Sequence, residues 1–91
     1  MSKFIAVHTV QPMTKEDWMG QVQGISDKMS QLPPGVAYNI SYCDLASGII
    51  FCDWEAPNKD IVEQVIAATG LPLDAVYPVN TFNPAKMAFE D

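Results

Sequence analysis

The spacing of five apolar side chains in the first third of the chain most constrains the fold. These side chains recur at steps of four, three, four and three residues, which places them on one stripe of a helix. They are Trp18, Val22, Ile25, Met29 and Leu32. Thr14 suits the N-cap, because Asp17 follows three residues later as in a capping box. The sequence PPG at 33–35 ends the helix, since proline has no amide donor.

Strand patterns surround this helix. Residues 3–10 predict a first strand, and residues 36–44 and 49–55 predict a hairpin that turns at Gly48. A second helix begins at Asn58 and ends at Gly70, and a last strand spans 75–82, where Pro78 favours a sheet edge. The order predicts a single α+β domain over 1–91 of ferredoxin-like βαββαβ type, with residues 82–91 as a C-terminal arm. In that fold a four-stranded antiparallel sheet carries both helices on one face.

The hairpin register predicts which side chains share a face. With a four-residue loop, Tyr42 pairs with Phe51 and Ile40 pairs with Asp53. We expect the helix side to hold Ile50, Cys52 and Trp54, together with Ile5 and Val7 from the first strand. The helix-free side is then expected to hold Phe4, Ala6, His8, Tyr38, Tyr42, Phe51 and Asp53.

Composition narrows the classes of partner. The 91 residues include eleven Asp and Glu against five Lys and no Arg, for a net charge of −6. Without a basic patch we expect neither nucleic acid nor a membrane surface as a partner. The sequence has no phosphate-binding loop, so we expect no nucleotide cofactor. The N-terminal segment MSKFIAVHTV lacks the features of a secretory signal, so we expect a cytoplasmic protein with reduced thiols.

Few residues carry chemistry. Cys43 and Cys52 lack the spacing and the number of donors of a zinc site, so we interpret them as small apolar side chains. His8 is the single histidine, and imidazole both binds metals and titrates near neutral pH. Asp53 lies among apolar neighbours in a strand and needs a partner there. We therefore predict His8 and Asp53 as metal ligands; for His8, an interface histidine that is hydrogen-bonded across a dimer is an equally good interpretation.

The aromatic helix-free side needs a cover, because large exposed apolar patches mark interfaces or ligand sites. We predict a homodimer whose sheets face each other, or a face half covered by the tail through Met87 and Phe89. Tyr38, Tyr42 and Phe51 are the predicted walls of a ligand site there.

Three segments, FIAVHTV, ASGIIFCDWEAPN and TGLPLDAVYPV, together resemble a family of small ferredoxin-like domains of unknown function that includes nickel-binding proteins. Members commonly carry paired histidines at the end of the first strand and further histidines in the second helix. Only His8 matches; Thr9, Val65 and Thr69 stand at the other positions. The resemblance implies binding of nickel or another divalent metal, or of a small ligand. The alternatives are a small dimeric α/β-barrel enzyme of the oxygenase or isomerase class, with His8 as acid/base, and a purely structural assembly domain.

Overall fold

The computed structural model describes residues 2–90. Nine elements follow one another along these residues. They are β1 (Ser2–Thr9), α1 (Lys15–Gly24), α2 (Ser26–Met29), β2 (Ala37–Asp44), β3 (Ile49–Ala56), α3 (Lys59–Thr69), β4 (Ala75–Val79), β5 (Phe82–Asn83) and β6 (Ala88–Phe89).

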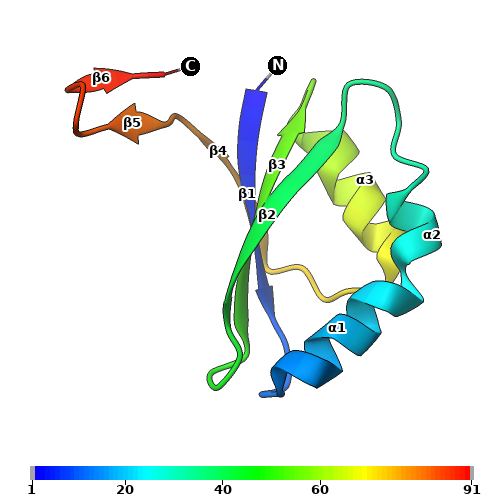
Figure 1. The fold of residues 1–91 in the computed structure, drawn as a ribbon. Coiled ribbons are helices and arrows are strands. Elements are labelled where there is room, and N and C mark those ends of the chain that lie inside the picture. Colours follow the sequence, from blue (N-terminus) through cyan, green and yellow to red (C-terminus); the bar gives the residue numbers. More distant parts are fainter. Residues whose placement is uncertain (1, 91) are drawn as a thin grey trace.

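Four of the strands form one antiparallel sheet in the order β2-β3-β1-β4. The helices lie on one side of this sheet (Figure 1). The predicted α+β class and four-stranded antiparallel sheet are therefore confirmed. Pro78 lies in β4 at the sheet edge, where a missing amide donor removes no ladder hydrogen bond.

The first helix is shorter than its apolar stripe predicts. Thr14 and Asp17 form the predicted capping box, with bonds of 3.1 and 3.3 Å between side chains and backbone amides. The helix ends at Gly24, and after Ile25 the chain continues as the single turn α2. The stripe still faces inward, although α1 contains no buried residue among those described. The helix therefore covers the sheet without packing tightly against it.

The β2–β3 hairpin has the predicted pairing near its turn. Tyr42 pairs with Phe51 and Ile40 pairs with Asp53, but a bulge between Tyr38 and Ile40 shifts the register. The extra residue reverses the alternation of side chains, so Tyr38 shares the helix side with Trp54. Our placement of Tyr38 on the helix-free side was wrong for this reason.

The two sides of β1 are the reverse of our prediction. Phe4, Ala6 and His8 pair with Trp54, Cys52 and Ile50 and are buried beneath the helices. The side chains of β1 that we assigned to the core, Ile5 and Val7, lie on the helix-free side. That side also places Lys3 beside Asp53 and Glu55, so the charged end of the strand finds opposite charges. Both sets of alternate side chains in β1 contain apolar residues, and we assigned the wrong set to the core.

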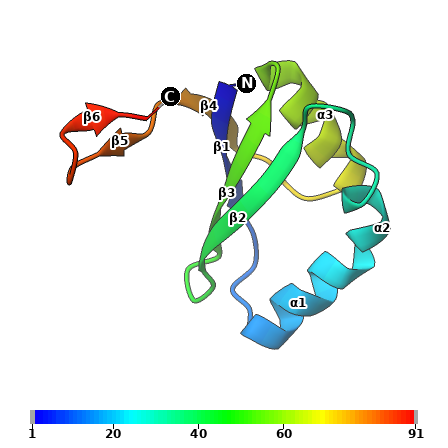
Figure 2. The same cartoon turned by 45° about the horizontal axis from the view of Figure 1, so that its top comes forward.

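We call the helix-free side of the sheet the open face. Its exposed large apolar residues are Ile40, Tyr42, Phe51 and Tyr77. The C-terminal strands β5 and β6 form a separate hairpin that projects away from the helices (Figure 2). Within residues 2–90, no helix has both the length and the apolar character needed to span a bilayer.

Candidate functional site

A pocket lies between the sheet and the helices, and we call it the helix-side pocket. Its volume is about 30 Å³, and since one water needs roughly 10–15 Å³ on this measure, it has room for two or three waters. Three strands of the sheet, β1, β2 and β3, and the helices α1, α2 and α3 contribute to its wall. The lining residues are His8, Trp18, Val22, Ile25, Met29, Tyr38, Cys52, Trp54, Ile66, Thr69 and Leu71.

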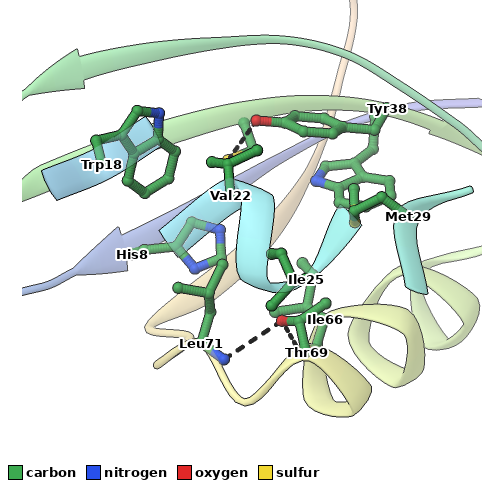
Figure 3. Close-up of a pocket in the computed structure, with 11 residues that line it drawn as sticks. His8, Trp18, Val22, Ile25, Met29, Tyr38, Ile66, Thr69 and Leu71 are labelled. Atoms are coloured by element: carbon green, nitrogen blue, oxygen red, sulfur yellow. Dashed lines mark hydrogen bonds between the residues drawn. The ribbon is translucent and has the colours of Figure 1, made fainter. Parts of the chain in front are cut away.

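His8 is the most polar group in the wall. The side chain is 2% exposed, and its Nδ1 lies 2.7 Å from the carbonyl oxygen of Pro72. A carbonyl oxygen only accepts, so Nδ1 carries a proton and donates it to this bond. In the neutral ring Nε2 then holds a lone pair, on the side of the ring away from Pro72 (Figure 3). The loop after α3 thus fixes both the orientation and the tautomer of the ring.

Trp54 supplies a second polar atom. Its indole ring stacks on Tyr38 with centroids 4.9 Å apart and an interplanar angle of 19°. The Nε1–H group is buried and has no acceptor among residues 2–90. An unpaired buried donor costs roughly 1–3 kcal/mol, so a guest that accepts this hydrogen bond would recover the cost.

The β2 side of the pocket holds a short chain of hydroxyl and thiol groups. The hydroxyls of Tyr38 and Ser41 are hydrogen-bonded, and Ser41 Oγ lies 3.2 Å from Cys52 Sγ. Burial raises the pKa of Tyr38 to about 12. Burial also raises the pKa of Cys52, against the opposing effect of its hydrogen bonds to Ser41 and Tyr38. Both side chains are therefore uncharged at neutral pH, and Cys52 is no ready thiolate.

The helices that close the pocket are held together mainly where α2, which follows α1, contacts the end of α3. Lys28 in α2 donates to the carbonyl oxygen of Ala68 at 2.6 Å, which places a cation at the C-terminal end of α3. Thr69 donates to Ile66 O at 2.6 Å and accepts from Leu71 N at 3.3 Å, which shapes the turn that leads to Pro72. By contrast, α1 contributes only partly buried side chains, such as Trp18 and Val22, to the pocket.

The structure separates the residues that we predicted as one metal site. His8 lies in the helix-side pocket, whereas Asp53 is on the open face, with Oδ2 3.2 Å from Lys3 Nζ. Within residues 2–90 no group of three or more His, Cys, Asp and Glu side chains is placed to hold a metal ion. Of the predicted ligand walls, Tyr38 lines the pocket with His8, while Tyr42 and Phe51 lie on the opposite face.

Sequence reasoning missed the pocket itself. Trp18 was placed on the apolar stripe of the first helix, and Cys52 and Trp54 were placed in the core on the helix side of the sheet. None of them was predicted as the wall of a site. No residue in β2 signalled the change of side at Tyr38, because Tyr38, Ile40 and Tyr42 alternate regularly with Asn39 and Ser41, and the bulge leaves that pattern unchanged. With Tyr38 placed on the helix side, the sequence would have predicted its stacking on Trp54.

Comparisons with known proteins agree with the fold and with one another. The family model described as "Nickel responsive protein SCO4226-like" matches residues 4–79. The crystal structure of SCO4226 from Streptomyces coelicolor A3(2) matches with a TM-score of 0.70 and 24% sequence identity, covering 86% of this chain and 95% of that chain. A comparison with curated proteins finds no match. The match over residues 4–79 shows that the chain belongs to the nickel responsive protein SCO4226-like family.

Proposed function

We propose that this protein binds a small, uncharged and mainly apolar molecule in the helix-side pocket, with Nε2 of His8 as the recognition group. The observation that carries the proposal is the hydrogen bond from His8 Nδ1 to Pro72 O at 2.7 Å. It fixes the orientation of a buried imidazole that lines the pocket, and leaves Nε2 as the nitrogen that a bound molecule could use. Binding pockets typically combine apolar walls with a few placed polar groups of this kind.

The chemistry of the wall favours a hydroxyl-bearing guest. His8 Nε2 accepts a hydrogen bond, and the Nε1–H of Trp54 needs an acceptor. Phenols and alcohols offer both a donor and an acceptor in one group. The lining contains no Lys, and Cys52 and Tyr38 are held uncharged. The wall therefore offers no cation to balance the charge of an anionic guest unless His8 is protonated.

The size of the pocket adds a requirement. A molecule with one ring exceeds the space of about 30 Å³, so α1 must move outward to admit it. Among the elements around the pocket, α1 is the longer helix without a fully buried side chain, so we expect this helix to move rather than α3. We therefore expect binding to be accompanied by shifts along α1.

Divalent metal binding is the second candidate, and the family match favours it. The residues of one chain do not fit a complete metal centre, because the pocket offers only His8 Nε2 and the protonated Cys52 thiol. Asp53 cannot join them from the open face. A nickel or zinc site normally needs four or more donors, so any metal here would depend on donors outside this pocket.

An acid/base role for His8 and a cytoplasmic location stay predictions. An enzyme that uses His8 as acid/base would act in this same pocket and needs the same occupancy test first. A cytoplasmic location fits two cysteines that are both free in the structure, Cys43 exposed and Cys52 buried.

The test follows side-chain NMR signals of full-length, reduced protein during titration with phenol, with toluene and benzoate as comparison probes. We expect saturable shifts of the His8 imidazole and the Trp54 indole with phenol, and weaker effects with the other two. Trp54→Phe keeps the stacked ring but removes the donor, so phenol affinity should fall about fivefold to tenfold while toluene affinity stays the same. His8→Asn keeps an N–H for Pro72 but removes Nε2 and should act similarly.

Tyr77→Phe on the open face is the matched control and should bind phenol as the wild type does. Absence of saturable shifts, or unchanged phenol affinity in both pocket variants, would refute the pocket as the binding site. A parallel titration with Ni²⁺ and Zn²⁺ tests the second candidate. Metal-induced broadening at His8 that disappears in His8→Asn would support it, and an indifferent imidazole would remove it.

A further inference from the structure

A second hollow borders the helix-side pocket, and we call it the outer hollow. Its volume is about 280 Å³, compared with about 30 Å³ for the pocket on the same measure. Ile25, Thr69 and Leu71 belong to the walls of both spaces, and Figure 3 shows them in the wall of the pocket. The two spaces are therefore separated by little more than these side chains. The lining residues of the outer hollow are Gln21, Gly24, Ile25, Thr69, Gly70 and Leu71.

The movement that admits a ring to the pocket would also join the two spaces. The proposed function requires α1 to move outward, and Ile25 is the C-cap residue of that helix. We expect Ile25 to move with α1, while Thr69 and Leu71 stay with the end of α3 and the loop after it. A guest in the pocket then has a passage through which a substituent reaches the outer hollow.

The outer hollow differs from the pocket in its electrostatics. α1 ends at Gly24 and α3 ends at Thr69, so the C-terminal ends of two helices border the same space. The carbonyl groups at such an end carry a partial negative charge, equivalent to about half an elementary charge. Neither helix has a basic residue in its last turn, and the residues that line the hollow include no charged side chain. Lys28 donates to the carbonyl oxygen of Ala68 in α3 but lines neither space.

We propose that the guest is a hydroxylated amine, whose uncharged hydroxyl end lies in the helix-side pocket and whose short tail carries a protonated amine into the outer hollow. The inference rests on the proposed function and refines it, because the uncharged part is the part that enters the pocket. The ammonium group stays in contact with water in the hollow, which avoids the cost of burying a charge. The net charge of −6 also favours the approach of a cation.

Three phenols with different para substituents test the inference. Tyramine carries a protonated amine, tyrosol carries an uncharged hydroxyl on the same linker, and para-hydroxyphenylacetate carries a carboxylate. NMR titration of full-length, reduced protein at neutral pH and low ionic strength measures their dissociation constants beside that of phenol. We expect tyramine to bind about threefold to tenfold more tightly than tyrosol, and para-hydroxyphenylacetate to bind more weakly than tyrosol. The preference for tyramine should shrink at physiological salt, because exposed charges are then screened beyond about 8 Å.

Two lysine variants decide whether the outer hollow causes the preference. Gln21→Lys places a cation at the hollow and should remove the preference for tyramine over tyrosol. Met19→Lys is the matched control, because it adds the same charge to α1 from a side chain that is 59% exposed and lines neither space. This control should keep most of the preference.

The outcomes separate this inference from the proposed function. Phenol that binds in the pocket, while tyramine binds no more tightly than tyrosol, would overturn the inference and leave the proposed function intact. A preference for tyramine that both lysine variants reduce equally would also overturn it, because the charge of the whole chain would then be the cause. If none of the four compounds gives saturable shifts, the inference and the proposed function fail together.

Discussion

At the scale of single residues, burial keeps Tyr38 and Cys52 of the helix-side pocket uncharged at neutral pH, and the raised pKa of Tyr38 makes the stability of the fold fall at alkaline pH. The pKa of Tyr38 is raised to about 12 in the folded chain, chiefly by burial, from about 10 for an exposed tyrosine. The unfolded chain therefore loses its phenolic proton first as the pH rises. The stabilisation is complete below about pH 10 and is lost progressively between about pH 10 and 12.

Urea unfolding of wild type and Tyr38→Phe under reducing conditions measures this effect. We expect the two free energies of unfolding to converge as the pH rises through that range, because only the wild type has the phenol. One proton sets an upper limit of about 1.4 kcal/mol per pH unit, and solvent screening at the half-buried ring lowers it. Curves that stay parallel from neutral pH to pH 12 would contradict the assignment.

The sequence identified the residue types of the site more reliably than it identified the side of the sheet on which each residue lies. His8 was identifiable as the single imidazole, and Cys52 and Trp54 were identifiable as helix-facing. The side of β1 on which His8 lies was not identifiable, because both sets of alternate side chains in that strand contain apolar residues. The contact that decides it, from His8 to Pro72, spans 64 residues. Tyr38 was misplaced because a single-residue bulge changes a face without changing composition.

At the scale of elements, α1 is the weakest part of the cover over the pocket, and Gly20 contributes to that weakness. A Cβ added at Gly20 would meet no atom within 4 Å, so alanine fits the helix without a clash. Gly20→Ala should raise the free energy of unfolding by about 0.5–1 kcal/mol, since glycine loses more backbone entropy in a helix. Chemical denaturation measures the change.

Gly48→Ala is the opposing control. Gly48 has φ +75°, and a Cβ there would lie 2.0 Å from Val10 O, so this substitution should lower stability by more than about 1 kcal/mol. Gly20→Ala without any gain in stability would mean that α1 is not an ordered helix in solution. The sequence predicted the start of α1 from Thr14 and Asp17, but not its end, because the apolar stripe continues through Ile25.

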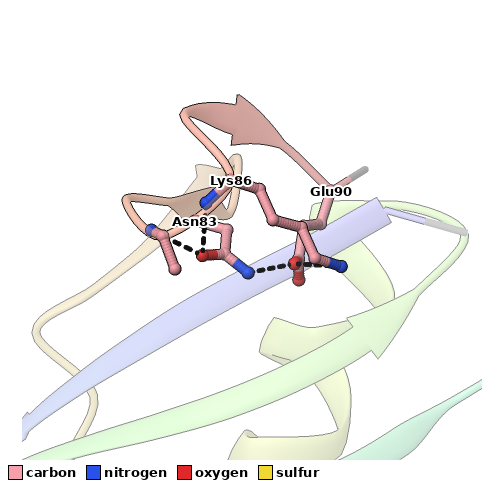
Figure 4. Close-up of polar contacts among 4 residues, drawn as sticks. Asn83, Lys86 and Glu90 are labelled. Carbon is pink, nitrogen blue, oxygen red and sulfur yellow. Dashed lines mark hydrogen bonds and ion pairs between the residues drawn. The ribbon is translucent and has the colours of Figure 1, made fainter.

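At the scale of the whole molecule, the sequence predicted the α+β class and the antiparallel sheet because each element has its own periodicity and caps. It did not predict the C-terminal hairpin, which depends on Asn83 accepting two backbone amides and reaching Glu90 across the turn (Figure 4). The pattern of apolar residues does not predict such local hydrogen bonds between polar groups. The same limit applies to the side of the sheet on which Tyr38 lies, because the bulge before Ile40 is not marked in the sequence of β2.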